Sequence, residues 1–245
     1  MTTRSARSAR TVAIWLSLAL LLGLPAAVRA EKRDRPKLKG KTWTWNFAAD
    51  TLGLAPTGAR VYGGTWAVVL DSSRAVLSAV APTDSASGPD SVLTGPRFLR
   101  QREGDDGITY HYLQFPKPHL KDLEASVRFR IREGDIDPTA GIAFHLDPKG
   151  RNGYVVRVSG AKGEIVAHYI IYGKRRDLRV AAIDPPEPGA WHTLGVRKQG
   201  SVLEVTYDGA SIFRIRDERF SEGNVGLWTE DDTIVDFSDL VVRSL

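Results

Sequence analysis

The sequence predicts an all-β protein whose strands form a two-sheet antiparallel sandwich or jelly roll. Three observations support this class: no amphipathic helix follows Lys41, the apolar runs are short and rich in β-branched and aromatic residues, and Gly-containing turns separate them. So many strands with no helices between them indicate two packed antiparallel sheets. The runs that read as strands are residues 42–47, 64–70, 75–81, 91–95, 107–115, 122–132, 139–147, 153–159, 164–172, 176–183, 190–198, 201–207, 211–216, 224–229 and 233–243.

The clearest of these strands spans residues 123–131, where apolar and polar side chains alternate without a break. Successive side chains of a strand point to opposite faces, so Val127 and Phe129 are expected to face the core and Arg128 the solvent. No change of composition marks a second domain. Residues 42–245 are therefore predicted to form a single domain.

Residues 1–30 are predicted to be a Sec-type signal peptide. Three arginines and no acid precede an apolar run over residues 12–24, and the segment ends at Ala30 with small residues at −3 and −1. The run is shorter than the roughly 20 residues that span a bilayer. Cleavage after Ala30 predicts a periplasmic or secreted protein with no membrane span. An uncleaved anchor is the alternative, favoured by the basic residues that follow directly.

The charge of the chain is concentrated near its N-terminus. Four of the 34 basic residues and none of the 29 acidic residues lie in the signal segment, so the mature chain carries 30 basic and 29 acidic side chains. Residues 31–41 hold six basic and two acidic residues and are interpreted as a basic linker, which leaves residues 42–245 near −3. A basic tail in front of an acidic body argues against a nucleic-acid partner. The absence of cysteine excludes disulfides, thiolate nucleophiles and cysteine-ligated zinc.

Several motifs follow one another closely in the second half of the chain. They are Asn152-Gly-Tyr-Val-Val-Arg157, Trp191-His-Thr-Leu-Gly-Val196, Tyr207-Asp-Gly-Ala-Ser-Ile-Phe213, Phe220-Ser-Glu-Gly-Asn-Val-Gly-Leu-Trp-Thr229 and Phe237-Ser-Asp-Leu-Val241. Together they resemble the concanavalin A-like jelly-roll domains of exported bacterial proteins, of the 3-keto-disaccharide hydrolase (family 16 glycoside hydrolase-like) type, with laminin-G modules as more distant relatives. The resemblance covers residues 107–245 and, more weakly, residues 42–106. It implies the fold and, as one activity, hydrolysis of modified glycosides; the same fold also hosts lectins and adhesion modules.

The carboxylate pair of a family 16 glucanase is not found. A retaining glycosidase needs two carboxylates about 5–5.5 Å apart, and these glucanases carry them in a Glu-x-Asp-x-x-Glu motif. The nearest match, Glu133-Gly-Asp135-Ile-Asp137, lacks the final Glu and lies in Gly/Pro turn sequence rather than on a rigid strand. The glucanase mechanism is therefore not supported, and whether the protein is an enzyme stays open.

An acidic cluster begins at Glu230 and includes Asp231 and Asp232, which are candidate calcium ligands because Ca²⁺ takes six to eight oxygens. No Asp-x-Asp-x-Asp-Gly loop is present, and the acids lie in a tight turn between two strands. We interpret the cluster as the solvated tip of a hairpin. No metal or other cofactor is therefore expected, with calcium as the alternative.

Polar residues are predicted to line the wet face of one sheet as a row that suits a carbohydrate, since Arg and His side chains beside aromatic rings commonly bind sugars. The ordinary polar surface of a sheet is the alternative interpretation. A hydrolase would also need acid–base groups, for which His145, His168 and Asp147 are the candidates. The candidate ligand-binding residues are Arg128, His145, Arg157, His168 and Tyr172.

The leading hypothesis is thus an exported jelly-roll protein that recognises carbohydrate. The first alternative is a hydrolase of modified glycosides of the 3-keto-disaccharide type. The second is a structural or adhesion module of the envelope that binds a protein.

Overall fold

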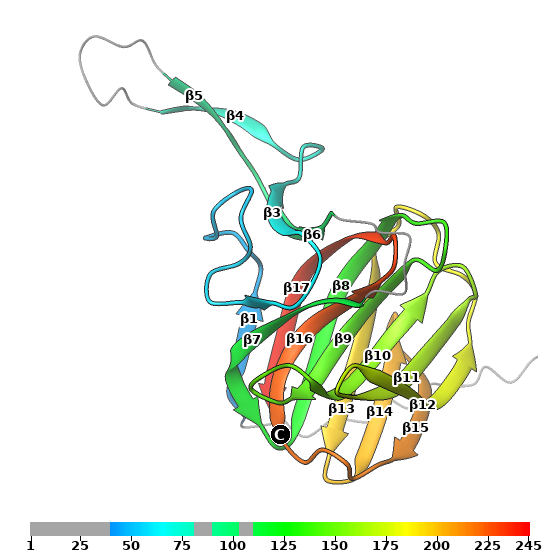
Figure 1. Cartoon of the computed structure of the whole chain (residues 1–245). Helices are drawn as coiled ribbons and strands as arrows, with labels where there is room; N and C mark the ends of the chain where they lie inside the picture. The colour runs from blue at the N-terminus through cyan, green and yellow to red at the C-terminus, as the bar shows by residue number, and fades with distance from the viewer. Residues whose placement is uncertain (1–39, 81–89, 103–109) are drawn as a thin grey trace, which may run out of the picture. The chain divides into compact units, whose positions relative to one another are not determined.

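The computed structural model describes residues 40–80, 90–102 and 110–245, and residues 38–245 form one compact unit. The described residues contain strands but no helices, and most of the strands belong to two antiparallel sheets (Figure 1). The all-β two-sheet sandwich expected from the sequence is confirmed. The predicted signal peptide and nearly all of the basic linker lie outside the described residues. Within the described ranges there is no helix long and apolar enough to cross a membrane.

The first sheet, sheet A, has the strand order β15-β14-β13-β8-β17-β6-β3, and β1 pairs with β17 beside this path. Its strands are β15 (Ala210–Arg216), β14 (Val202–Tyr207), β13 (His192–Gln199), β8 (Leu123–Glu133), β17 (Ile234–Ser244), β6 (Arg97–Gln101), β3 (Trp66–Leu70) and β1 (Thr42–Trp45).

The second sheet, sheet B, has the order β12-β11-β10-β9-β16-β7-β2. Its strands are β12 (Lys174–Ala182), β11 (Glu164–Ile171), β10 (Asn152–Ser159), β9 (Thr139–Leu146), β16 (Gly223–Glu230), β7 (Tyr110–Leu120) and β2 (Arg60–Val61). A separate hairpin joins β4 (Val76–Val80) to β5 (Asp90–Thr94). The sequence pattern did not predict β2, which has two residues, or β6, whose five residues include two arginines.

The core lies between the two sheets and follows the alternation read from the sequence. On β8, Leu123, Val127 and Phe129 are buried against sheet B, while Arg128 is exposed on the opposite face. A fully buried Val, Leu, Ile or Phe side chain contributes about 1.5–3 kcal/mol. Because the chain has no cysteine, this packing stabilises the fold without any disulfide.

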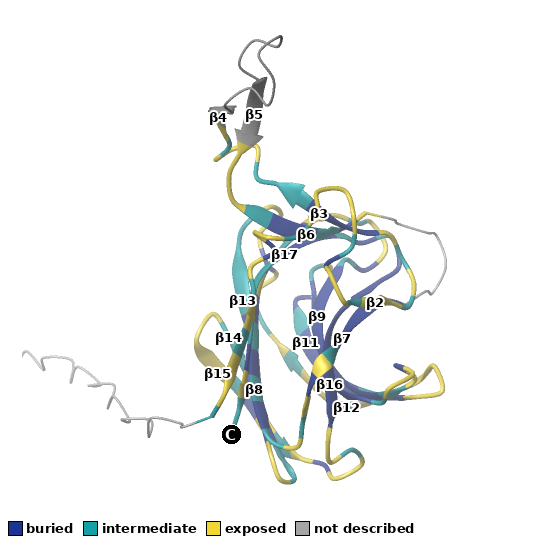
Figure 2. Cartoon of the chain, turned by 90° about the vertical axis from the view of Figure 1, so that its left-hand side faces the viewer, coloured by how far each residue is buried: buried dark blue, intermediate teal, exposed yellow. Residues whose placement is uncertain are grey.

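The inner strands of sheet B depart from simple alternation because their side chains are buried on both faces (Figure 2). Every residue of β9 and β16 is buried. A second apolar cluster lies on the outer face and contains Ala143, Leu146, Val155, Ile170 and Trp228. The middle of the outer face is therefore packed, and polar side chains embedded there are costly unless they have hydrogen-bond or ion-pair partners.

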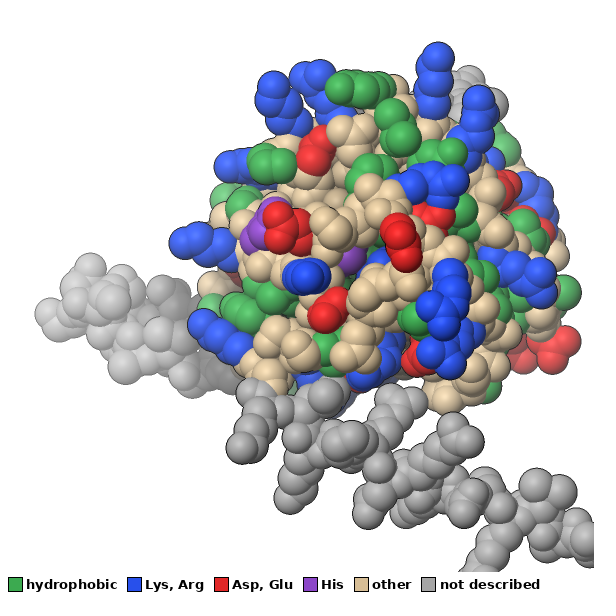
Figure 3. Space-filling view, turned by 90° about the horizontal axis from the view of Figure 1, so that it is seen from below, with side chains coloured by type: hydrophobic (Ala, Val, Ile, Leu, Met, Phe, Trp, Pro, Cys, Tyr) green, Lys and Arg blue, Asp and Glu red, His purple; other side chains and the backbone are tan. Residues whose placement is uncertain are grey.

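Figure 3 shows one end of the protein, where basic and acidic side chains lie beside one another. Mixed charge of this kind is ordinary solvated surface.

Candidate ligand-binding site

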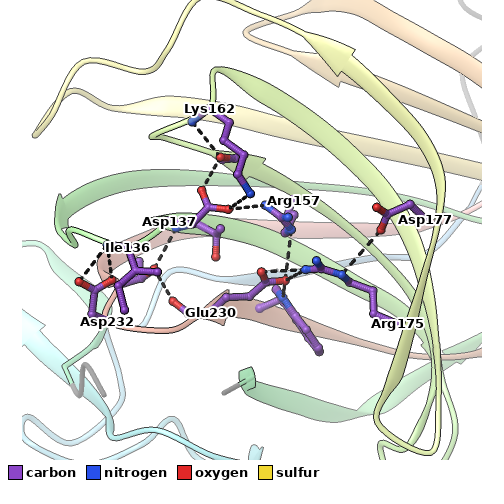
Figure 4. A network of polar contacts seen from close by, with 12 residues as sticks. Ile136, Asp137, Arg157, Lys162, Arg175, Asp177, Glu230 and Asp232 are labelled. Carbon is purple, nitrogen blue, oxygen red and sulfur yellow. Dashed lines mark hydrogen bonds and ion pairs between the residues drawn. The ribbon is translucent and has the colours of Figure 1, made fainter. Parts of the chain in front are cut away.

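A network of charged residues crosses the outer face of sheet B (Figure 4). Arg157, on β10, is its hub: its Nη1 lies 3.7 Å from Asp137 Oδ2 and its Nε lies 3.2 Å from Glu230 Oε1. All three side chains are buried. The register places Gly141 of β9 directly between Arg157 and Trp228. A Cβ at Gly141 would lie 3.1 Å from that of Arg157, so the glycine makes room for the Arg157 side chain.

Asp137 anchors the network at the loop before β9. Its Oδ1 accepts a hydrogen bond from the hydroxyl of Ser159, and its Oδ2 accepts one from Lys162 Nζ at 2.9 Å. Both carboxylate oxygens are thus engaged, and the Arg157 guanidinium adds a second charge contact to Oδ2.

Glu230, the last residue of β16, joins the network to the opposite edge of the sheet. Arg175 Nη1 donates to both of its carboxylate oxygens at 3.1 and 3.0 Å, and Trp228 Nε1 donates to Oε1 at 3.0 Å. Burial opposes the charge of Arg175, but Glu230 outweighs that effect and raises the pKa of the guanidinium.

The contact between Arg175 and Glu230 shows that sheet B is curled. Strand β12 is separated from β16 by β11, β10 and β9. At about 4.8 Å per strand, residues four strands apart in a flat sheet lie about 19 Å apart. An ion pair across that span requires the outer face of the sheet to be concave. We call this surface, with the network and the aromatic residues beside it, the concave face.

The interpretation of the acidic cluster as a solvated hairpin tip was wrong. Glu230 is 4% exposed and Asp231 8% exposed. The turn is buried because it binds the loop before β9: Asp232 accepts hydrogen bonds from the backbone N–H groups of Asp135 and Ile136 at 2.6 and 3.2 Å. Likewise, the N–H of Thr139 donates to the Thr233 hydroxyl at 2.9 Å.

His168 lies on the concave face beside this network and is completely buried. Its ring stands edge-on to Trp228 at 5.7 Å between centroids. Burial lowers the pKa of His168 well below its ordinary value, and the nearby charges of Arg157 and Arg175 lower it further. Neither ring nitrogen has a hydrogen-bond partner among the described residues, and Arg157 Nε and Nη1, although ion-paired, make no aligned hydrogen bond there. The concave face therefore retains unused hydrogen-bonding groups.

Aromatic rings form a continuous strip along one side of the concave face. Tyr62 stacks on Tyr112 at 5.1 Å, Tyr112 stacks on Trp228 at 5.2 Å, and Tyr110 packs on Trp228 at 4.8 Å. The three tyrosines are partly exposed, whereas Trp228 is buried beneath them. Burial raises the pKa of Tyr110 and of Tyr112, so both hydroxyls remain protonated donors at neutral pH.

The structure brings together only two of the predicted ligand-binding residues, Arg157 and His168. The expectation of one row on a single sheet face was wrong, because the residues divide between different parts of the sandwich. Arg128 lies on the outer face of sheet A, where its Nη1 is 3.3 Å from Asp239 Oδ2. Tyr172 occupies the turn between β11 and β12 and is strongly exposed.

The other two acid–base candidates have structural partners. His145 is buried at the end of β9, with Nδ1 2.9 Å from the carbonyl oxygen of Phe220, and its burial lowers its pKa. Asp147 accepts hydrogen bonds from the backbone N–H groups of Lys149 and Arg151, both at 2.9 Å. Neither residue touches the charged network of the concave face through any hydrogen bond or ion pair described for it.

Several residues of the concave face were not identified from the sequence. Residues two apart on a strand share a face, so the sequence could have placed Glu230 beside Trp228. The acidic residues that follow Glu230 instead led to the interpretation of a solvent-exposed turn. Arg175 had no such signal, because its role depends on the curl of sheet B. Among the described residues, no group of three or more His, Asp or Glu side chains is arranged to hold a metal ion, and the calcium candidates Asp231 and Asp232 belong to no such group.

No protein-family profile matches the chain, and no curated protein matches it. Solved structures of the same fold do match. A carbohydrate-binding module, CBM66 from Bacillus subtilis, aligns with 80% of this chain and 99% of its own at 16% identity and a TM-score of 0.59. The exoplasmic/lumenal domain of VIP36, in its Ca²⁺/Man3GlcNAc-bound form, aligns with 74% of this chain and 84% of its own at 15% identity and a TM-score of 0.50. The fold is thus that of the concanavalin A-like jelly rolls.

Proposed function

We propose that the protein is exported and recognises carbohydrate on the concave face of sheet B. One observation carries this proposal: a strip of partly exposed tyrosines runs beside a charged network whose outermost members reach solvent. Sugar rings stack on aromatic faces, and their hydroxyls both donate and accept hydrogen bonds. The concave face offers both kinds of contact.

The network holds its outer members in fixed positions. Arg175 is bound to the buried Glu230. Its Nε also lies 3.7 Å from Oδ1 of Asp177, whose side chain is half-exposed. A guanidinium and a carboxylate held in this way lose little side-chain entropy when a ligand binds. Tyr172, exposed at the end of the same sheet, is proposed as a rim contact.

The two structural relatives support a sugar as the ligand class. CBM66 is described as a carbohydrate-binding module, and VIP36 was solved with bound Man3GlcNAc. At their low identity they share the fold alone, so the argument for this chain rests on its own aromatic strip and charged network.

Hydrolysis of a modified glycoside is the second candidate, because Asp137 and Glu230 are two carboxylates that contact one guanidinium on one sheet face. Their oxygens are, however, already occupied by donors from Ser159, Lys162, Arg175 and Trp228. A carboxylate with its lone pairs engaged in this way is suited to positioning a ligand rather than to transferring a proton. Recognition is therefore the better supported function.

A glycan array tests the proposal. The native protein is expected to bind a restricted set of oligosaccharides. Asp177→Asn is expected to weaken binding about tenfold or more, since a lost hydrogen bond to a charged group costs about 1.5–3 kcal/mol, and Tyr112→Ala about two- to tenfold, since aromatic stacking contributes about 0.5–1.5 kcal/mol. Trp43→Ala is the matched control, because Trp43 lies on β1 of sheet A with Lys41 over its ring. Binding that survives in both concave-face variants but is lost in Trp43→Ala would contradict the proposal.

Activity and export have separate tests. Release of sugar from a 3-keto-glucoside, lost in His168→Gln or His145→Gln, would make the hydrolase the correct function. Recovery of the protein in periplasm or medium, with its N-terminus at Glu31, is the expected result for export.

A further inference from the structure

A second site is indicated on the outer face of sheet A, whereas the polar network lies on sheet B. Arg130 of β8, Asp236 of β17 and Arg100 of β6 stand side by side across three neighbouring strands. Residues two apart on a strand share a face, so this face also carries Arg128, two residues before Arg130 on β8, and Phe98, two residues before Arg100 on β6. Beside them is a pocket of about 220 Å³, lined mainly by Arg74, Arg97, Phe98, Arg128, Arg130 and Trp191.

Arg128 and Arg130, two of the arginines that line this pocket, are held in place, and Arg100 lies beside them outside the lining. Asp236 is completely buried and accepts hydrogen bonds from Arg100 Nε at 2.6 Å and from Arg130 Nη2 at 2.7 Å. The guanidinium carbons of Arg128 and Arg130 lie 5.0 and 4.6 Å from the centre of the Trp191 ring. Such stacking fixes the plane of a guanidinium and leaves its outer N–H groups free to bind.

Positive charge exceeds negative charge around the pocket. Asp236 supplies one negative charge for Arg100 and Arg130 together. Asp239 faces Arg128, but both side chains are about half exposed, at 47% and 46%, so solvent weakens that pair. Asp71, the one acid that lines the pocket, accepts hydrogen bonds from the N–H and hydroxyl groups of Ser73.

The two remaining arginines have no carboxylate partner among the described residues. Arg97 donates to the backbone carbonyl of Asp50, and no ion pair is formed by Arg74 within the described part of the chain. The pocket thus collects guanidinium groups without a matching number of carboxylates.

We propose that this pocket binds an oxyanion, a carboxylate, sulfate or phosphate group, carried by a small molecule or by an acidic saccharide. Arginine matches the planar or tetrahedral oxygens of such groups through paired hydrogen bonds. At about 220 Å³ the pocket is smaller than the 300–1,000 Å³ typical of drug-sized ligands. It accommodates one charged group with at most the ring that carries it, packed against Trp191. This site is independent of the concave face.

Titration calorimetry on the protein expressed from its full sequence, at constant ionic strength, tests the site. The probes are inorganic sulfate, inorganic phosphate, trigalacturonate and, as a neutral sugar, maltotriose. Arg128→Gln and the double variant Arg74→Gln/Arg128→Gln remove exposed charges whose ion pairing is weak, so both are expected to fold. Arg216→Gln is the matched control: it removes an exposed arginine from β15 of the same sheet, and within the described part of the chain its one side-chain hydrogen bond runs from Nη1 to the Ser201 hydroxyl at 3.3 Å.

At least one anionic probe is expected to bind saturably, with affinity reduced about tenfold in Arg128→Gln and further in the double variant. Arg216→Gln and Asp177→Asn should retain the native affinity. If trigalacturonate binds more tightly than the inorganic anions and competes with them, the natural ligand is an acidic saccharide; the reverse order identifies a free anion. No saturable binding of any anion, or an equal loss in Arg216→Gln, would overturn the proposal. Failure here leaves the concave-face proposal intact, because Asp177→Asn and Tyr112→Ala test that surface separately.

Discussion

At the scale of single residues, Glu230 is predicted to stabilise the fold through the arginines that it neutralises. Removing one partner of a buried ion pair leaves an uncompensated buried charge and costs 3–5 kcal/mol. Glu230→Gln is therefore expected to lower the free energy of unfolding by about 3 kcal/mol in urea denaturation. Glu204→Gln is the control, since Glu204 makes the same kind of contact with Arg214 at the surface and its loss should cost less than about 1 kcal/mol. Equal effects of the two substitutions would mean that the network is not coupled to stability.

His168 is predicted to make the protein sensitive to acid. Its folded-state pKa is lowered by burial and by the two neighbouring arginines. As the pH falls through about 6.5, His168 therefore takes up a proton in the unfolded chain but stays neutral in the folded protein. Stability should fall as the pH drops below about 6.5, by up to about 2 kcal/mol between pH 6.5 and 5.0 from this residue. His145 acts in the same direction.

Denaturation of His168→Gln at several pH values measures that contribution. The variant should lose less stability than the native protein between pH 6.5 and 5.0. His119→Gln, which removes an exposed imidazole on β7, should keep the native slope. Parallel curves for the native protein and His168→Gln would show that His168 is protonated in the folded state.

At the scale of elements, the turn between β16 and β17 is predicted to hold the loop before β9 in place. Asp232 accepts hydrogen bonds from the N–H groups of Asp135 and Ile136, and losing a hydrogen bond to a charged group costs about 1.5–3 kcal/mol. In Asp232→Ala, hydrogen exchange of these two amides should accelerate about tenfold or more, while the exchange of β8 stays unchanged. Asp135→Asn removes an acid from the same loop but keeps the acceptor, so it should leave the amide of Ile136 protected.

The elements themselves were largely predictable from the sequence. Alternation in residues 123–131 identified β8, because a strand with one buried face repeats every two residues. The burial of the β16–β17 turn was not predictable, since the acids of that turn find their partners in residues nearly a hundred positions away. A polar turn is exposed to solvent only where no distant loop donates backbone N–H groups to its side chains.

At the scale of the whole molecule, the curl of sheet B determines which residues meet. Local periodicity assigned Arg157 and His168 to the outer face correctly, but it carried no information on which sheet each strand joins. Arg128 therefore seemed to share a surface with Arg157, although β8 belongs to sheet A and β10 to sheet B. Arg175 and Glu230 lie four strands apart in the order of sheet B, and the curl of the sheet brings them together in a hydrogen bond.

The most direct test of the central claim is to map where a sugar binds, by hydrogen exchange of the native protein with and without the oligosaccharide that binds most strongly on the glycan array. Recognition on the concave face predicts slower exchange in residues 110–112, 174–178 and 228–230, with β8, β13 and β14 unchanged. Slower exchange confined to strands of sheet A, with those three segments unaffected, would contradict it.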